Sequence, residues 1–149
     1  CDAFMGKVDA YFDAQPAALT IQHRDFRIDN ILFAPDAGAH VVDWQTLGPG
    51  AGASDVAYLL GTSIADADVR AKEETRLVRF YVDQLRAGGA AADAEQVWRE
   101  YRLYAFSGVL MAIIASTNVE RTERGDEMFA VMTERPARQA LHLDSLTLL

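Results

Sequence analysis

Residues 22–30, QHRDFRIDN, place a dense group of charged and amide side chains between two apolar segments. Six of the eight positions from 23 to 30 carry such groups: His23, Arg24, Asp25, Arg27, Asp29 and Asn30. The flanking segments are AALTI before the stretch and ILF after it, and both have the composition of buried strands. The stretch is a solvated turn, a metal site or the working loop of an enzyme, and its surroundings decide between these.

A β-hairpin is predicted directly after this stretch. The segment ILFAPDAGAHVVDW contains two apolar runs, at 31–34 and 40–43, on either side of PDAG, which is a strong turn signal. With the turn centred between residues 36 and 37, antiparallel pairing sets Asn30 opposite Asp43 at the open end. Asp25 precedes Asn30 on a loop by five residues and reaches the same place.

The three side chains that meet there suit a magnesium-dependent reaction. Asn30 and Asp43 supply hard oxygen ligands, and Mg²⁺ takes few protein ligands and completes its shell with water and phosphate oxygens. Asp25 reaches the site without having to bind the metal, which leaves its carboxylate free to accept a proton.

Composition bounds the class of protein. The 149 residues fit one domain, and a chain that is 50% hydrophobic and 24% charged is globular. A formal net charge of −8 is opposite to what binding to nucleic acid or to an anionic membrane surface requires, so neither partner is expected. Cys1 is the single cysteine and CDAFMGKVDAYF lacks the pattern of a signal peptide, which predicts a reducing, cytoplasmic setting.

The remainder of the chain is predicted to be mainly helical. An uncharged stretch at 103–119 is long enough for a membrane span, but its polar residues favour a buried helix. The predicted elements are a helix at 2–14, a strand at 18–22, a loop at 46–54, a helix capped by Ser54, a helix at 68–85 with Val69, Leu77, Phe80, Tyr81 and Leu85 on its apolar side, a helix from Asp93 that includes 103–119, and a helix at 126–146 interrupted at Pro136.

Three motifs in order resemble a known family. HRDFRIDN resembles the kinase catalytic-loop pattern HxDxxxxN, and VVDWQ resembles the segment with the metal-binding aspartate. GASDVAYLL, residues 52–60, is similar to the Gly-x-x-Asp-Leu-Ala segment that follows that aspartate. The combination resembles the small-molecule kinases: the aminoglycoside phosphotransferases, choline kinases and ecdysteroid-kinase-like proteins.

The resemblance implies a fold and a reaction. The fold is α+β and mostly helical, the C-terminal lobe of a protein-kinase-like enzyme over residues 1–149, with the catalytic loop and metal hairpin at 20–55 and a helical part at 55–149. The reaction is ATP- and Mg²⁺-dependent phosphoryl transfer to a hydroxyl of a small molecule. Its roles are distributed as follows: Asp25 as catalytic base, Arg27 on the transferred phosphate, Asn30 and Asp43 on Mg²⁺ and the nucleotide phosphates, and His23 and Asp55 as supports of the loop.

Each motif residue also has a structural interpretation. Asp25, Asn30 and Asp43 are alternatively turn caps. Arg27 alternatively pairs with Asp29 in solvent, and Asp55 is alternatively an ordinary acid in the first turn of a helix. Arg24 departs from the family, which usually has glycine there. The substrate cannot be identified from the sequence, because Tyr101, Tyr104 and Met111 line its pocket or belong to the core.

The nucleotide-clamping half of the family fold is not found before residue 23. No glycine-rich strand–turn–strand, strand lysine or partner glutamate helix precedes it, so the chain is expected to be a fragment with little activity alone. The alternative is a stand-alone lobe without catalysis that acts as a binding module, or forms a homodimer through the face left by the missing lobe.

Overall fold

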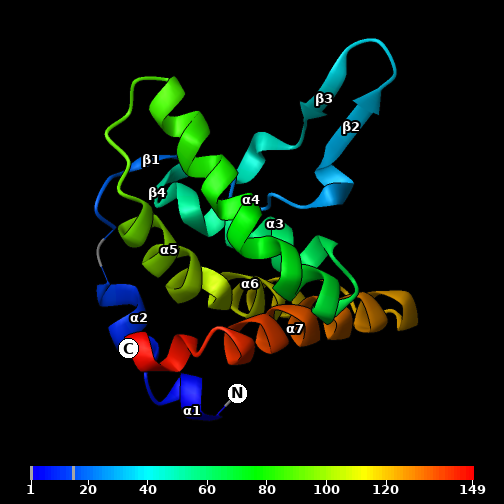
Figure 1. The fold of residues 1–149 in the computed structure, drawn as a ribbon. Helices are drawn as coiled ribbons and strands as arrows, with labels where there is room; N and C mark the ends of the chain where they lie inside the picture. Colours follow the sequence, from blue (N-terminus) through cyan, green and yellow to red (C-terminus); the bar gives the residue numbers. More distant parts are fainter. Residues whose placement is uncertain (1, 15) are drawn as a thin grey trace.

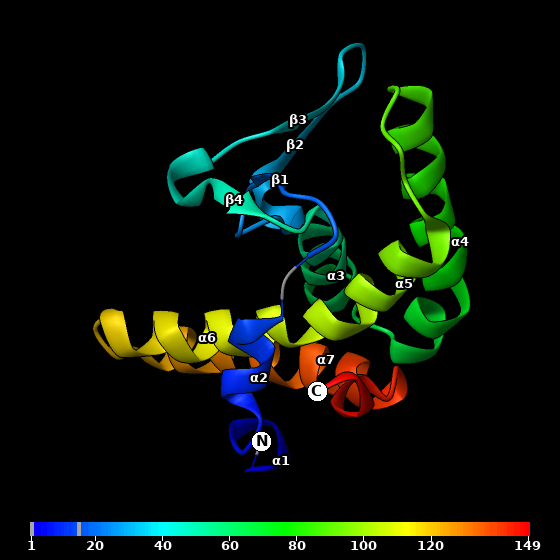
Figure 2. The same cartoon turned by 90° about the vertical axis from the view of Figure 1, so that its left-hand side faces the viewer.

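The computed structural model describes residues 2–14 and 16–149 as a mostly helical structure with two small antiparallel sheets, compatible with an α+β fold. In both views the β2–β3 hairpin projects from the end opposite α6 and α7 (Figure 1, Figure 2). The elements are α1 (Asp2–Met5), α2 (Val8–Asp13), β1 (Thr20–Gln22), β2 (Ile31–Ala34), β3 (Gly38–Val41), β4 (Gly48–Gly50), α3 (Gly52–Ser63), α4 (Ala67–Ala87), α5 (Ala94–Leu103), α6 (Ser107–Asn118) and α7 (Glu123–His142), with 3-10 turns at Ile28–Asn30, Trp44–Thr46, Tyr104–Phe106 and Ser145–Leu148.

The predicted hairpin is present, with a register one residue away from the expected one. β2 and β3 pair with Ala34 opposite Gly38, so three residues form the connection. Gly38 has a φ of 77°, the left-handed conformation that such loops place on glycine. The odd loop sets Asn30 opposite Val42, whose N–H donates to the Asn30 carbonyl at 2.9 Å. The predicted pairing with Asp43 is therefore wrong by one residue.

The stretch predicted as a loop at 46–54 contains a strand and the start of a helix. β4 pairs antiparallel with β1 across this stretch, and the ends of two long side chains lie close to two of its glycines. A Cβ at Gly48 would lie 2.4 Å from the Arg24 guanidinium carbon, and one at Gly50 would lie within 2 Å of the Gln22 side chain. The sequence did not predict this strand, because the strand consists of glycine and proline and both are depleted in strands generally.

The cap of α3 is also different from the predicted one. α3 begins at Gly52, before Ser54, and Ala51 stands at its N-cap position without a side-chain bond. The Ser54 hydroxyl lies 2.8 Å from the Ser107 hydroxyl of α6. Ser54 therefore connects two helices and does not cap one.

Helix α4 buries a face that only partly matches the predicted one: Leu77 packs against the core, and Tyr81 and Leu85 are half-buried. Val69 and Phe80 are about half exposed. The buried face instead carries Arg70 and Glu74, an ion pair at 3.4 Å with side chains 3% and 2% exposed. Tyr101 donates to the Glu74 carboxylate at 3.0 Å, which supplies the partner that a buried charge requires. The hydrophobic core gathers around this point from α3, α4, α5 and the 3-10 turn after α5: Ala57, Leu60, Val78, Tyr101, Leu103 and Phe106.

The apolar stretch 103–119 is not one central helix. α5 ends at Leu103, a 3-10 turn follows, and α6 begins at Ser107 with Ile113 and Ile114 at least 40% exposed. Within the described residues, no helix is long and apolar enough to cross a membrane. The predicted helix at 2–14 is likewise divided, because α1 and α2 are separated at Gly6 and Lys7.

α7 runs without interruption through Pro136, contrary to the prediction. α6 lies alongside α7 (Figure 1, Figure 2), and the Pro136 ring packs on Gly108. A Cβ at Gly108 would lie 2.5 Å from Pro136 Cγ. The missing side chain at Gly108 thus provides the space in which the proline ring is buried.

Replacing Gly108 with alanine is expected to lower the free energy of unfolding by roughly 1–3 kcal/mol, because the added methyl overpacks a rigid ring. Denaturant unfolding followed by circular dichroism measures this. Gly88→Ala is the control, since Gly88 has a φ of −77° and its nearest neighbour would lie 3.4 Å from the new Cβ. An equal loss of unfolding free energy in the two variants would contradict the packing of Pro136 on Gly108.

Candidate functional site

The Asp55 carboxylate holds the first residues of the catalytic-loop stretch to helix α3. The N–H groups of His23 and Arg24 donate to Asp55 Oδ2 and Oδ1 at 2.7 and 3.0 Å. Burial, the larger effect, raises the pKa of the Asp55 carboxyl, and the two N–H groups oppose that shift. Arg24 has a φ of 68°, a conformation that glycine adopts more easily. This is a physical reason for the glycine that the small-molecule kinases, which the motifs resemble, usually have at this position.

The His23 ring connects the loop to the hairpin. His23 is 2% exposed, its Nε2 lies 2.8 Å from the Val42 carbonyl, and its Nδ1 accepts from the Asp25 N–H at 3.3 Å. Only the neutral tautomer with the proton on Nε2 satisfies both bonds. The Thr46 hydroxyl donates to the His23 carbonyl at 2.7 Å. These contacts place His23 where a residue that supports the loop would lie, and this role of His23 stays a prediction.

Two neutral donors hold the carboxylate of Asp25. The Tyr58 hydroxyl donates to Oδ1 at 2.9 Å, and Asn30 Nδ2 donates to Oδ2 at 3.0 Å. Burial, followed by the charge of Asp25, raises the pKa of Tyr58, so its phenol remains a donor at neutral pH. Since a carboxylate offers about four acceptor positions, Asp25 retains capacity for a further proton donor. Its side chain is 24% exposed.

Asn30 and Asp43 lie at the open end of the hairpin. Asn30 Nδ2 also donates to the Asp25 carbonyl at 2.8 Å, so its Oδ1 is the atom left for a ligand. Asp43 directly follows Val42, is exposed and has a φ of 63°. The described residues contain no cluster of three His, Cys, Asp or Glu side chains around one point. An amide oxygen and a carboxylate nevertheless fit Mg²⁺, which draws its other ligands from water and phosphate.

Arg27 lies between Asp25 and a pocket. Its Nε is 3.6 Å from Asp25 Oδ1, and an Nη is 3.6 Å from Asp29 Oδ2. The same Nη contacts the Met132 sulfur at 3.8 Å, which is a weak acceptor. Each interpretation of Arg27 therefore has a contact that agrees with it. Arg27 lies near Asp29, and its side chain is three-quarters buried beside Asp25.

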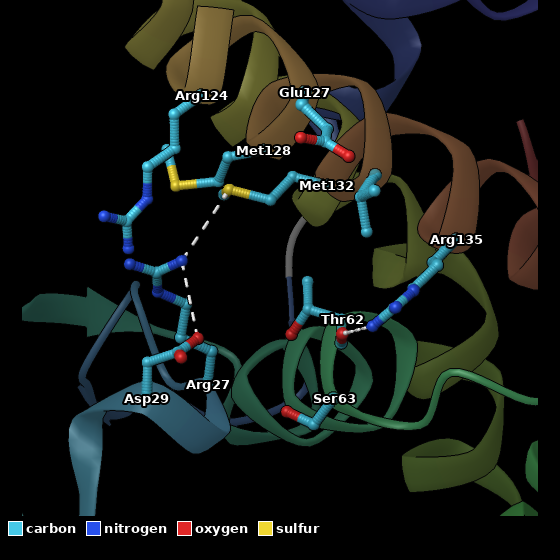
Figure 3. Close-up of a pocket in the computed structure, with 10 residues that line it drawn as sticks. Arg27, Asp29, Thr62, Ser63, Arg124, Glu127, Met128, Met132 and Arg135 are labelled. Atoms are coloured by element: carbon cyan, nitrogen blue, oxygen red, sulfur yellow. Dashed lines mark hydrogen bonds and ion pairs between the residues drawn. The ribbon is translucent and has the colours of Figure 1, made fainter.

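The pocket beside Arg27 has a volume of about 320 Å³ and lies between residues 27–29, the end of α3 and residues 124–135 of α7. Figure 3 shows the guanidinium groups of Arg27 and Arg124 pointing toward one another there. We call it the arginine pocket, lined by Arg27, Asp29, Thr62, Ser63, Arg124, Glu127, Met128, Val131, Met132 and Arg135.

A second cavity of about 580 Å³ lies along the first half of α3, and Asp55 and Tyr58 form part of its wall. Tyr104 and Met111 line it, whereas Tyr101 is fully buried and belongs to the core. Arg24 also borders this cavity and donates to the Pro49 carbonyl at 2.8 Å. Arg24 therefore has a structural contact that connects the loop to β4.

Tyr58 and Arg124 were not among the predicted site residues. Tyr58 follows Asp55 by three positions on α3, and residues three apart share a helix face, so a signal for it was present in GASDVAYLL. Arg124 is almost a hundred residues from Arg27, and no local pattern connects the two.

Comparison with protein-family models matches residues 2–104 to the phosphotransferase enzyme family, APH. The match includes the catalytic-loop stretch, the hairpin and α3 to α5, and it covers more than half of the 149 residues. The chain belongs to this family, as its motifs predicted, and this supports phosphotransferase activity in general. Searches of curated proteins and of solved structures found no match.

Replacing Asp55 with asparagine is expected to destabilise the protein by about 1–3 kcal/mol, because an amide NH₂ then faces one of the two backbone N–H donors. Amide hydrogen exchange measures the loss of stability residue by residue, and protection of the His23 and Arg24 amides should fall most. Asp83→Asn, at an exposed position of α4, is the matched control. Unchanged protection at both amides would contradict the role of Asp55.

Proposed function

We propose that the protein is a kinase for a small hydroxylated molecule and transfers the γ-phosphoryl group of ATP in the presence of Mg²⁺. The observation that carries this proposal is the environment of Asp25, whose carboxylate is held by Tyr58 and Asn30 beside the hairpin end that carries Asp43. Membership of the phosphotransferase family supports the general reaction, and the geometry supports the division of roles.

Asp25 acts on the hydroxyl of the acceptor. The hydroxyl donates to a free acceptor position of the carboxylate, which orients its oxygen toward phosphorus. As the bond from oxygen to phosphorus forms, the bond to the leaving ADP breaks and the hydroxyl proton passes to Asp25. Tyr58 and Asn30 keep the carboxylate in place during this step, because both donate to it in the resting structure.

Asn30 and Asp43 would hold the metal ion. Bound Mg²⁺ neutralises negative charge on the nucleotide phosphates. Asn30 Oδ1 is available for it because the Asn30 amide nitrogen is engaged by Asp25. His23 and Asp55 fix the backbone on either side of these ligands through Val42 and the start of the loop.

Arg27 supplies positive charge next to the reacting groups. Its Nε lies 3.6 Å from Asp25, so the guanidinium is within reach of a group bound at that carboxylate. Charge that develops on the phosphoryl oxygens is stabilised by such a fixed cation.

Association of two chains stays a separate proposal. Several large apolar side chains on and near the strands are at least 46% exposed: Leu19, Ile21, Leu32, Phe33, Trp44 and Leu47. Their burial by a second copy or by further protein would remove apolar surface from water.

Asp25→Asn in the protein encoded by the complete reading frame is expected to lower kcat by roughly 10²–10⁴-fold, because the base is lost. Turnover is measured with the best acceptor found in a panel of hydroxylated small molecules, and ATP affinity should stay within about twofold.

Asp36→Asn, in the exposed hairpin turn, is the control and should retain full turnover. Turnover of Asp25→Asn at the rate of this control would eliminate Asp25 as the base.

A further inference from the structure

The arginine pocket is rich in positive charge in an acidic protein. Three arginines and two acids line it, whereas the whole chain has a formal net charge of −8. Two of the three arginines come from α7 and one from the catalytic loop. The lining therefore has one more arginine than acid, and it forms where α7 approaches the loop (Figure 3).

Several hydrogen-bond donors in this pocket lack a good acceptor. Arg27 Nε is buried and has no hydrogen-bond partner in the described part of the chain. Arg124, an exposed residue at the start of α7, points into the same space (Figure 3). The Ser63 oxygen accepts from the Ile28 N–H at 3.0 Å, so its hydroxyl hydrogen remains to be donated. Facing guanidinium groups repel one another unless an anion lies between them.

The two acids of the pocket do not cancel this arrangement. Asp29 is 68% exposed and lies 3.6 Å from one Arg27 nitrogen, a weak pair in solvent. Glu127 lies on α7, as Arg124 does, and Met128 and Met132 separate it from the two facing guanidinium groups in Figure 3. Arg135 donates to the Thr62 carbonyl at 3.0 Å, so Arg27 and Arg124 are the cations that a ligand meets.

The other features of the pocket indicate the size and nature of the ligand. Met128, Val131 and Met132 give it an apolar wall, and about 320 Å³ lies at the small end of ligand sites. Arg27 lines the pocket, and its Nε lies 3.6 Å from Oδ1 of the proposed base, Asp25. A molecule anchored here thus presents to Asp25 a hydroxyl that lies only a few bonds from its anchoring group.

We propose that the arginine pocket binds an acidic group of the acceptor, so that the substrate class is a small hydroxylated acid. The anion lies between Arg124 and Arg27 Nη1, which contacts Met132 in the pocket, while Arg27 Nε stays beside Asp25; the short carbon skeleton lies against the methionines. This inference rests on the proposed kinase function. A carboxylate and a phosphate ester share the required chemistry, and the transferred phosphoryl group is the other possible source of such an anion.

The test is binding to the 149-residue chain, followed by NMR of backbone amides and arginine Nε–H signals. The probes are 3-hydroxybutyrate, inorganic phosphate and choline. 3-Hydroxybutyrate should produce saturable shifts at Arg27, Arg124 and Ser63, and phosphate should displace it. Arg124→Gln should weaken 3-hydroxybutyrate about tenfold or more, because a charge-assisted hydrogen bond is lost.

Arg138→Gln is the matched control, since Arg138 lies on the same helix, is exposed and pairs with Glu134 at 2.7 Å. It should bind 3-hydroxybutyrate as the unchanged chain does. Binding of phosphate alone would assign the pocket to the transferred phosphoryl group, and preferred binding of choline would assign it to a cation; either result overturns the proposal. Equal affinity in Arg124→Gln, or no saturable binding, overturns it as well.

Failure of the proposed substrate class can be distinguished from failure of the proposed kinase function. Lack of 3-hydroxybutyrate binding together with turnover that depends on Asp25 overturns only the substrate class. Binding that depends on Arg124, together with turnover that is indifferent to Asp25, overturns only the kinase mechanism.

Discussion

The two hydrogen bonds from the loop backbone to the Asp55 carboxylate are the constraint on which the site depends. They fix the peptide groups of His23 and Arg24 at the start of α3, although Arg24 must adopt a positive φ there. Helix α3 also carries Tyr58, which holds Asp25. One helix turn thus positions both the backbone and the carboxylate of the loop, and a charged acceptor makes such bonds stronger than neutral ones.

The remaining contacts extend this constraint to the hairpin. His23 bonds the Val42 carbonyl, and Asn30 bonds both the Val42 N–H and Asp25. These bonds use the groups that face inward and leave Asn30 Oδ1, the Asp43 carboxylate and part of Asp25 for ligands. The structure therefore separates the atoms that hold the loop and hairpin together from the atoms that have remaining binding capacity, and this is the arrangement expected of a preorganised site.

The sequence predicted the local features best. The spacing of HRDFRIDN, the PDAG turn and Asp55 in GASDVAYLL indicated the family and the elements that meet at the site. The register of the hairpin differed by one residue, because loop length depends on the conformation of Gly38. Features that depend on distant partners were not predictable. The buried face of α4 exists because Tyr101 supplies a bond to Glu74, and the arginine pocket exists because α7 approaches the loop.

The central claim is that Asn30 and Asp43 form a metal site beside Asp25, and a titration with Mn²⁺, a paramagnetic substitute for Mg²⁺, tests it most directly. The account predicts selective broadening of the NMR signals of Asn30 and Asp43 at low Mn²⁺. Asp43→Asn should weaken Mn²⁺ at least about tenfold, because a charged ligand is lost, whereas Asp36→Asn in the same hairpin should not. Broadening centred on other residues, or equal affinity in the two variants, would contradict the account.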